Sequence, residues 1–211
     1  MFAIHASYRG RSKRRAEYVR SVADALAASA AVDAVELKGV EDFVCLTTGA
    51  EQAGGLVLSL LQAGDFAIGI GATIGSAQLA LQDDEDESSG EAMAAATRAV
   101  KATHKAGTVA VRIEKAGPGG VLAPGKAAEI TEDIHAAFTL LAHVLARRTK
   151  EGREATALMR AGYLQSEAAA EVGISKQAMS QRLAAAGWYA EQAGWGLAIR
   201  MLARVDELRV D

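Results

Sequence analysis

The sequence predicts an α+β protein in which a ferredoxin-like N-terminal domain, residues 1–122, precedes an all-helical domain, residues 123–211. In the first part, short β-like segments alternate with longer stretches of helical periodicity, in the order of a split βαβ unit. Both prolines, Pro118 and Pro124, lie in the glycine-rich stretch 116–125, which is typical of a domain boundary. Only helical patterns follow this stretch.

The predicted elements of the N-terminal domain follow from two periodicities. Apolar residues that alternate indicate strands, and apolar residues three and four positions apart indicate helices. Strands are predicted at 2–8, 40–48, 66–75 and 108–114, with helices after Ser12, at 53–61 and at 90–104. The acidic run 83–87 is predicted to be a loop. The glycines at 69, 71 and 75 lack the spacing of a dinucleotide fingerprint, so they indicate a buried strand.

The composition excludes several classes of protein. With 50% hydrophobic and 23% charged residues and a formal net charge of −3, the chain is expected to be globular rather than disordered. The single cysteine, Cys45, cannot form an internal disulfide, which fits a reducing cytoplasm. No apolar run approaches the roughly 20 residues that a membrane span needs. The first residues run directly into a charged stretch, unlike a secretory signal. We therefore expect a cytoplasmic protein without membrane contact.

Catalytic and metal sites are not expected. The four histidines are scattered, and none lies at metal-ligand spacing from another ligating residue. The chain has no Gly-x-Ser-x-Gly elbow, and Cys45 lies in an apolar segment, where a thiol is more often a packing group than a nucleophile. The sequence accordingly predicts no cofactor.

Residues 165–186 have the spacing of a helix-turn-helix. Ala169 provides the small residue that two closely crossing helices need, and Gly173 provides a turn residue that tolerates a left-handed backbone. Ser175 is placed to cap the second helix. The apolar residues predicted to close the core beneath are Val172, Ile174, Met179 and Leu183.

The outward face of the second helix is suited to DNA. Lysine can donate to guanine, glutamine can pair with adenine, and serine or arginine can hold phosphates. The residues predicted to contact DNA are Ser175, Lys176, Gln177, Ser180, Gln181 and Arg182, with Arg148, Lys150 and Arg153 as phosphate contacts upstream. The alternative is a helical hairpin that binds no DNA.

The stretch 172–183 resembles the helix-turn-helix core of sigma-factor region 4 and of many repressors. Across the whole chain, the order of a basic first helix, the segments 48–52, 68–72 and 90–99, and the final helix-turn-helix resembles the SatD family. This resemblance implies a nucleotide-cyclase-like N-terminal domain followed by a DNA-binding domain.

The chain departs from the cyclase-like pattern at the metal carboxylates. The pattern holds two metal ions with acids on the first strand and in the central hairpin. Here the first strand has no acid, and Ala50 stands where an aspartate is expected, which leaves only Glu51. We therefore expect no enzymatic activity.

Two functions follow from these motifs. The first is a sequence-specific DNA-binding protein, a transcriptional regulator that binds double-stranded DNA as a homodimer, whose N-terminal domain dimerises or binds a small molecule or nucleotide. The alternative is a nucleotide-binding or enzymatic cyclase-like protein in which the helix-turn-helix contacts protein. The final stripe, Trp195, Ile199, Leu202 and Val205, either covers the helix-turn-helix core or pairs with a second subunit.

Overall fold

The computed structural model describes residues 1–74, 85–115 and 124–208, and within them the protein is α+β, as predicted. Five strands form one mixed sheet: β1 (Phe2–Tyr8), β2 (Ala34–Leu37), β3 (Asp42–Thr47), β4 (Phe66–Ile74) and β5 (Val109–Lys115). The helices are α1 (Arg15–Ala27), α2 (Ala50–Ala63), α3 (Glu85–Val100), α4 (Pro124–Ala146), α5 (Lys150–Arg160), α6 (Gln165–Glu171), α7 (Lys176–Ala185) and α8 (Trp188–Ala203), followed by the 3-10 helix η2 (Arg204–Leu208). None of the helices described is both long and apolar enough for a membrane span.

The strand order in the sheet is β2-β3-β1-β4-β5. All neighbours are antiparallel except β4 and β5, which are parallel. At the centre, Ile4 of β1 lies between Cys45 of β3 and Ile70 of β4. Every residue of β1 and β4 is buried, because helices cover both faces of the sheet.

One strand was not predicted, and another is shorter than predicted. The edge strand β2 is four residues long and mostly exposed, so it lacks the apolar alternation from which a strand is recognised. The strand predicted at 40–48 corresponds to β3, which begins only at Asp42. The residues before it, Lys38, Gly39 and Val40, belong to the turn after β2.

The predicted acidic loop is wrong for residues 85–87, which belong to the first turn of α3. The loop was predicted from the run of like charges, but the helix dipole favours acidic residues in the first turn of a helix. Asp83 and Asp84 lie outside the described residues, as do residues 116–123 of the predicted domain boundary.

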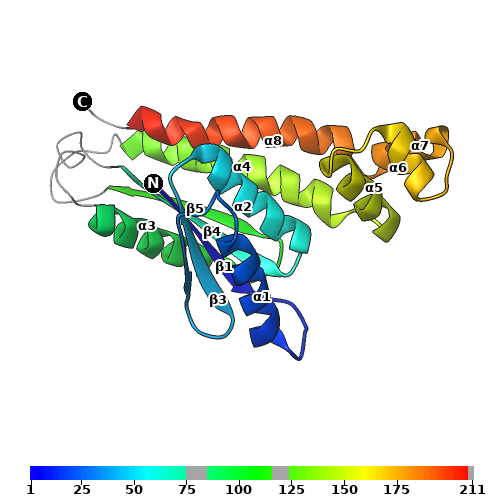
Figure 1. The fold of residues 1–211 in the computed structure, drawn as a ribbon. Coiled ribbons are helices and arrows are strands. Elements are labelled where there is room, and N and C mark those ends of the chain that lie inside the picture. Colours follow the sequence, from blue (N-terminus) through cyan, green and yellow to red (C-terminus); the bar gives the residue numbers. More distant parts are fainter. Residues whose placement is uncertain (75–84, 116–123, 209–211) are drawn as a thin grey trace.

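The larger hydrophobic core lies on one face of the sheet, under α1, α2, α4 and α8. It contains residues from both sides of residue 122: Ile4 and Leu60 pack in the same cluster as Phe138 and Leu202. The helices α4 and α8 lie side by side along this layer (Figure 1).

The predicted stripe lies on α8 and η2, and none of its residues belongs to the core beneath α6 and α7. The side chains of Trp195 and Ile199 lie against Gly54 of α2, and Leu202 and Val205 are buried in the same chain. Trp195 and Ile199 therefore hold α8 against α2, and the expectation that the stripe covers the helix-turn-helix core is wrong.

The opposite face of the sheet is covered by α3, which approaches β4 closely. A Cβ on Gly71 would lie 2.2 Å from the Ala92 carbonyl oxygen, and a Cβ on Gly69 would lie 2.3 Å from the Ala96 carbonyl oxygen. Glycine is needed at both positions because backbone packs directly on backbone. The close contact with α3 therefore accounts for the glycines at positions 69 and 71, and no bound dinucleotide is needed to explain their spacing.

A buried histidine lies in this second interface. His5 of β1 is 4% exposed, and its Nδ1 lies 3.0 Å from the hydroxyl oxygen of Thr97 in α3. The same hydroxyl donates to the Met93 carbonyl oxygen at 2.8 Å, so Nδ1 is the donor to Thr97. Burial lowers the pKa of His5, and the imidazole is therefore neutral at neutral pH.

This shift predicts a pH dependence of stability. In the unfolded chain the imidazole binds a proton with its ordinary pKa of 6.5, so below that pH the unfolded state binds more protons than the folded state. The free energy of unfolding is expected to fall as the pH decreases below about 6.5, by at most ~1.4 kcal/mol per pH unit. Urea titrations between about pH 5 and 7.5 measure this slope, and a His5→Asn variant should reduce it. An unchanged slope in the variant would assign the dependence to other groups.

Candidate nucleic-acid interface

Three short helices, α5, α6 and α7, project from one end of the molecule (Figure 1). They enclose a small core of their own, separate from the cluster on the sheet. Its buried residues are Ala155, Ala168, Ala169, Met179 and Leu183, with Val172 and Ile174 packed against them. The predicted core residues thus meet beneath α6 and α7.

The turn between α6 and α7 depends on Gly173. This residue has φ of +68°, a left-handed conformation that favours glycine. The amide of Ile174 donates to the Ala169 carbonyl oxygen at 2.9 Å, which closes the end of α6. Ser175 caps α7 as predicted, because its Oγ accepts from the Ala178 amide at 3.1 Å.

A further contact ties the two helices together at the start of α7. The side-chain amide of Gln165 donates to the Lys176 carbonyl oxygen at 3.2 Å. The pair α6 and α7 is therefore held by a turn, a cap and a side-chain bridge, and it presents the outward face of α7 in one orientation.

Five of the six DNA-contact residues predicted from Ser175 onward are exposed: Ser175, Lys176, Gln177, Ser180 and Gln181. The sixth, Arg182, is partly buried, and its guanidinium lies 3.7 Å from a carboxylate oxygen of Glu154 in α5. Exposed pairs at this distance contribute little free energy, so a phosphate can compete for this arginine. The sequence of α7 itself contains no acidic residue.

The upstream basic residues divide into two groups. Lys150 and Arg153 on α5 are exposed, as is Arg147 before the helix. Arg148 was predicted to hold phosphate, and this prediction is wrong, because its side chain is 2% exposed and is ion-paired with Glu191 of α8. A guanidinium enclosed in this way is not accessible to DNA.

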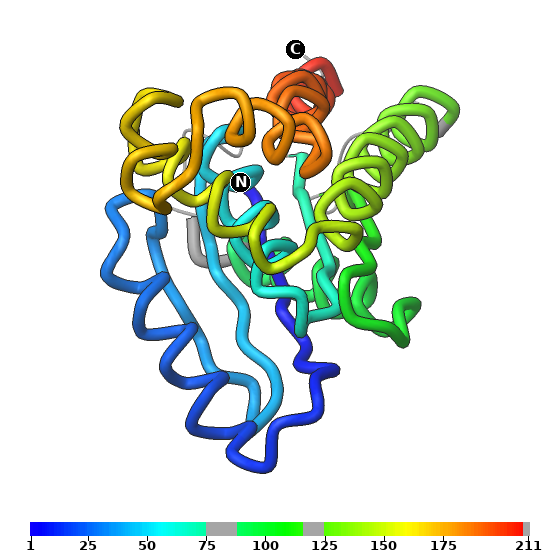
Figure 2. Tube along the Cα trace, turned by 90° about the vertical axis from the view of Figure 1, so that its right-hand side faces the viewer, coloured from blue at the N-terminus to red at the C-terminus, as the bar shows by residue number. Residues whose placement is uncertain are grey.

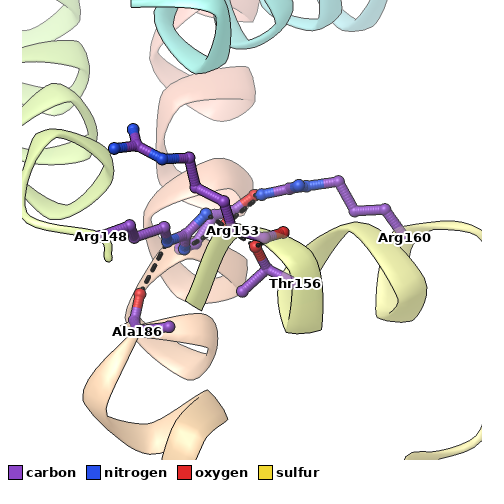
Figure 3. Close-up of polar contacts among 6 residues, drawn as sticks. Arg148, Arg153, Thr156, Arg160 and Ala186 are labelled. Atoms are coloured by element: carbon purple, nitrogen blue, oxygen red, sulfur yellow. Dashed lines mark hydrogen bonds and ion pairs between the residues drawn. The ribbon is translucent and has the colours of Figure 1, made fainter. Parts of the chain in front are cut away.

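A buried cluster of charges surrounds Glu191, whose side chain is 1% exposed. Arg160 donates to it from Nε at 3.0 Å and from Nη2 at 2.8 Å to each carboxylate oxygen. Arg148 also pairs with the Glu191 carboxylate through Nη2, and it donates from Nε to the Ala186 carbonyl oxygen at 2.8 Å (Figure 3). The guanidinium of Arg153 points away from this cluster (Figure 3).

This cluster is the joint between the three projecting helices and the rest of the chain. Its members come from the segment after α4, from α5, from the end of α7 and from α8. With its side-chain oxygen turned toward Arg160, Gln62 of α2 accepts from Nε at 3.0 Å and from Nη2 at 3.2 Å. The Arg160 guanidinium also lies 5.7 Å from the Trp188 ring. No periodicity in the sequence indicates this cluster, since its members are far apart along the chain.

The positions of the cyclase-like pattern lie elsewhere. Ala50 begins α2, and Glu51 is exposed in its first turn. Within the described residues, no group of three or more histidine, cysteine, aspartate or glutamate side chains could hold a metal ion. Cys45 is buried in β3, and burial raises the pKa of its thiol to about 12, so the thiol is protonated at neutral pH.

Comparisons of the chain with protein-family models, curated proteins and solved structures find no match.

Proposed function

We propose that this protein binds double-stranded DNA sequence-specifically, with α6 and α7 as a helix-turn-helix and α7 as its recognition helix. The observation that carries this proposal is the exposed, acid-free face of α7, which presents Lys176, Gln177 and Gln181 on a rigidly held helix pair. Base recognition requires side chains held in one orientation, and the turn, cap and side-chain bridge of this pair are compatible with that requirement.

The chemistry of this face fits the major groove. Glutamine can pair with adenine through both atoms of its amide, and lysine can donate to the acceptors of guanine. Ser175 and Ser180 can donate to phosphates, and Lys150, Arg153 and Arg182 extend the positive charge toward the backbone. The residues that would contact bases select the sequence, whereas the residues that would contact phosphates provide affinity for any sequence.

We further propose a ferredoxin-like N-terminal unit, formed by β1, α1, β2, β3, α2 and β4. Its strand order, β2-β3-β1-β4 with all neighbours antiparallel, supports this assignment, and β5 extends it as a parallel edge strand. The combination with a C-terminal helix-turn-helix is that of the SatD family. This unit would either dimerise the protein or bind a small molecule. Dimerisation would double the DNA site, because one helix-turn-helix reads only a few base pairs.

The proposal is tested at the two glutamines of α7. Replacing Gln177 and Gln181 by alanine should reduce discrimination between the preferred and other sequences by roughly 1–3 kcal/mol for each base that is no longer bound. The preferred sequence is first selected from a random duplex pool with the unaltered protein. Competition binding against a random duplex then measures discrimination.

Gln192→Ala provides the matched control, because Gln192 is an exposed glutamine on α8. This variant should discriminate as the unaltered protein does. Equal discrimination by the α7 double variant would refute the assignment of α7 as the recognition helix. Binding of nucleoside triphosphates without any binding of duplex DNA would favour the nucleotide-binding alternative instead.

A further inference from the structure

Cations from three separate loops gather at one end of the sheet. At this end β1 and β2 finish and β3, β4 and β5 begin, since Ser7 pairs with Asp42 and Tyr8 with Phe66. The loops here, together with the residues after α3, contain seven exposed basic residues, of which Arg14 pairs with Glu17. We call the other six the basic end: Arg9, Arg11, Lys13, Lys38, Lys101 and Lys105.

Backbone hydrogen bonds hold these loops against the strands. The Arg9 amide donates to the Asp65 carbonyl oxygen at 2.7 Å, and the Lys38 amide donates to the Asp42 carbonyl oxygen at 2.8 Å. On the far side, the Gly107 amide donates to the Phe66 carbonyl oxygen at 2.8 Å. The cations therefore project from a supported surface.

Most of this positive charge has no counter-charge within the protein. Among the described residues, Arg11, Lys13, Lys101 and Lys105 form no ion pair, and only Lys38 is paired, with Glu36. Of the nearby acids, Glu41 pairs with Arg15 at 2.8 Å, whereas Asp42, which accepts from the Ser7 hydroxyl, and Asp65 offset part of this charge. The basic end thus has an excess of positive charge, although the whole chain has a formal net charge of −3.

The lowered pKa of His5 agrees with this concentration of charge. Burial is the largest cause of its lowered pKa, but Lys38, Arg9 and Lys101 each lower it further, against the opposing effect of Asp42. Cations from three different segments therefore act on the same buried imidazole.

The carboxyl end of α2 links the basic end with α5. α2 ends here at Ala63 and is capped by Gly64, next to Asp65, whose carbonyl oxygen accepts from the Arg9 amide. Gln62 of α2 contacts Arg160 of α5. Figures 1 and 2 show the loop between β1 and α1 at the bottom of the molecule, below the helices α5–α7.

We propose that the basic end is a second DNA-binding surface, which contacts backbone phosphates flanking the sequence bound by α7. This inference rests on the proposed function and extends it. Arginine and lysine that lack internal partners can replace the counterions of phosphates, and such contacts are independent of base sequence. The surface would lengthen the DNA covered by each chain and increase its affinity for all sequences.

The experiment compares three proteins on a random-sequence duplex over a range of salt concentrations. One is unaltered, and a second has Arg11, Lys13 and Lys105 changed to glutamine. The control has Lys115, Lys126 and Arg200 changed to glutamine, which removes the same formal charge from β5, α4 and α8. Thermal unfolding verifies that each variant is folded.

Affinity falls as salt increases, so the slope of log affinity against log salt is negative. Its magnitude should be smaller by about 0.9 for each phosphate that the protein no longer neutralises, hence by about 2–3 in the basic-end variant. The control slope should remain close to that of the unaltered protein. Equal slopes for the basic-end and unaltered proteins, or an equal decrease in both triple variants, would overturn the proposal.

The α7 double variant distinguishes the two proposals. If it retains sequence discrimination while the basic-end variant shows the lower slope, the recognition helix is wrongly assigned and the phosphate surface stands. If the α7 variant loses discrimination while the basic-end slope is unchanged, the phosphate surface is refuted and the proposed function stands. Absence of duplex binding by the unaltered protein at low salt would refute both.

Discussion

Replacing Glu191 by alanine is expected to lower the free energy of unfolding by about 3–5 kcal/mol. The substitution leaves the Arg148 guanidinium buried without its counter-charge and removes the bidentate partner of Arg160. A charge enclosed without a partner costs more free energy than the ion pair itself contributes, because the desolvation penalty remains. Urea unfolding at neutral pH measures the effect.

Two comparisons make this prediction specific to the buried cluster. Glu154→Ala removes the exposed partner of Arg182 and should change stability by about 0–1 kcal/mol. The double variant Arg148→Met, Glu191→Leu removes both buried charges and should be more stable than Glu191→Ala alone. A loss below about 1 kcal/mol for Glu191→Ala would mean that water reaches Arg148 and that the joint is not closed.

The second large effect is expected at Gly71, where α3 rests on β4. A Cβ at this position would lie 2.2 Å from the Ala92 carbonyl oxygen and 2.3 Å from the Ala96 amide nitrogen. Both atoms belong to the helix backbone, so α3 as a whole must move to admit a methyl group. We expect Gly71→Ala to destabilise the protein by about 3 kcal/mol, at the upper end of the range for overpacked cores.

Gly55→Ala is the matched control with the opposite sign. Gly55 lies within α2, and a Cβ there would have no atom within 4 Å. Because alanine has a higher helix propensity than glycine, this variant should be more stable than the unaltered protein by about 0.5–1 kcal/mol. If Gly71→Ala were instead neutral in urea unfolding, the close contact between α3 and the sheet would be refuted.

Features encoded in neighbouring residues were predictable from the sequence. The α+β class, the strand patterns of β1 and β4, and the apolar stripe of α4 each follow from a short periodicity. The turn between α6 and α7 was predictable for the same reason, since Ala169, Gly173 and Ser175 all lie within one short stretch of sequence. The strand β2 was missed because an exposed edge strand has no such period.

The sequence by itself therefore determined the local elements and the exposed face of α7, whereas the tertiary structure decided which charges are available. Arg148 and Arg153 lie close together in the same basic stretch of sequence, but one is buried against Glu191 and the other is exposed. Arg11 and Lys105 are far apart in the chain, but the sheet brings their loops to the same end. Burial and charge proximity depend on contacts between distant segments, and such contacts leave no period in the sequence.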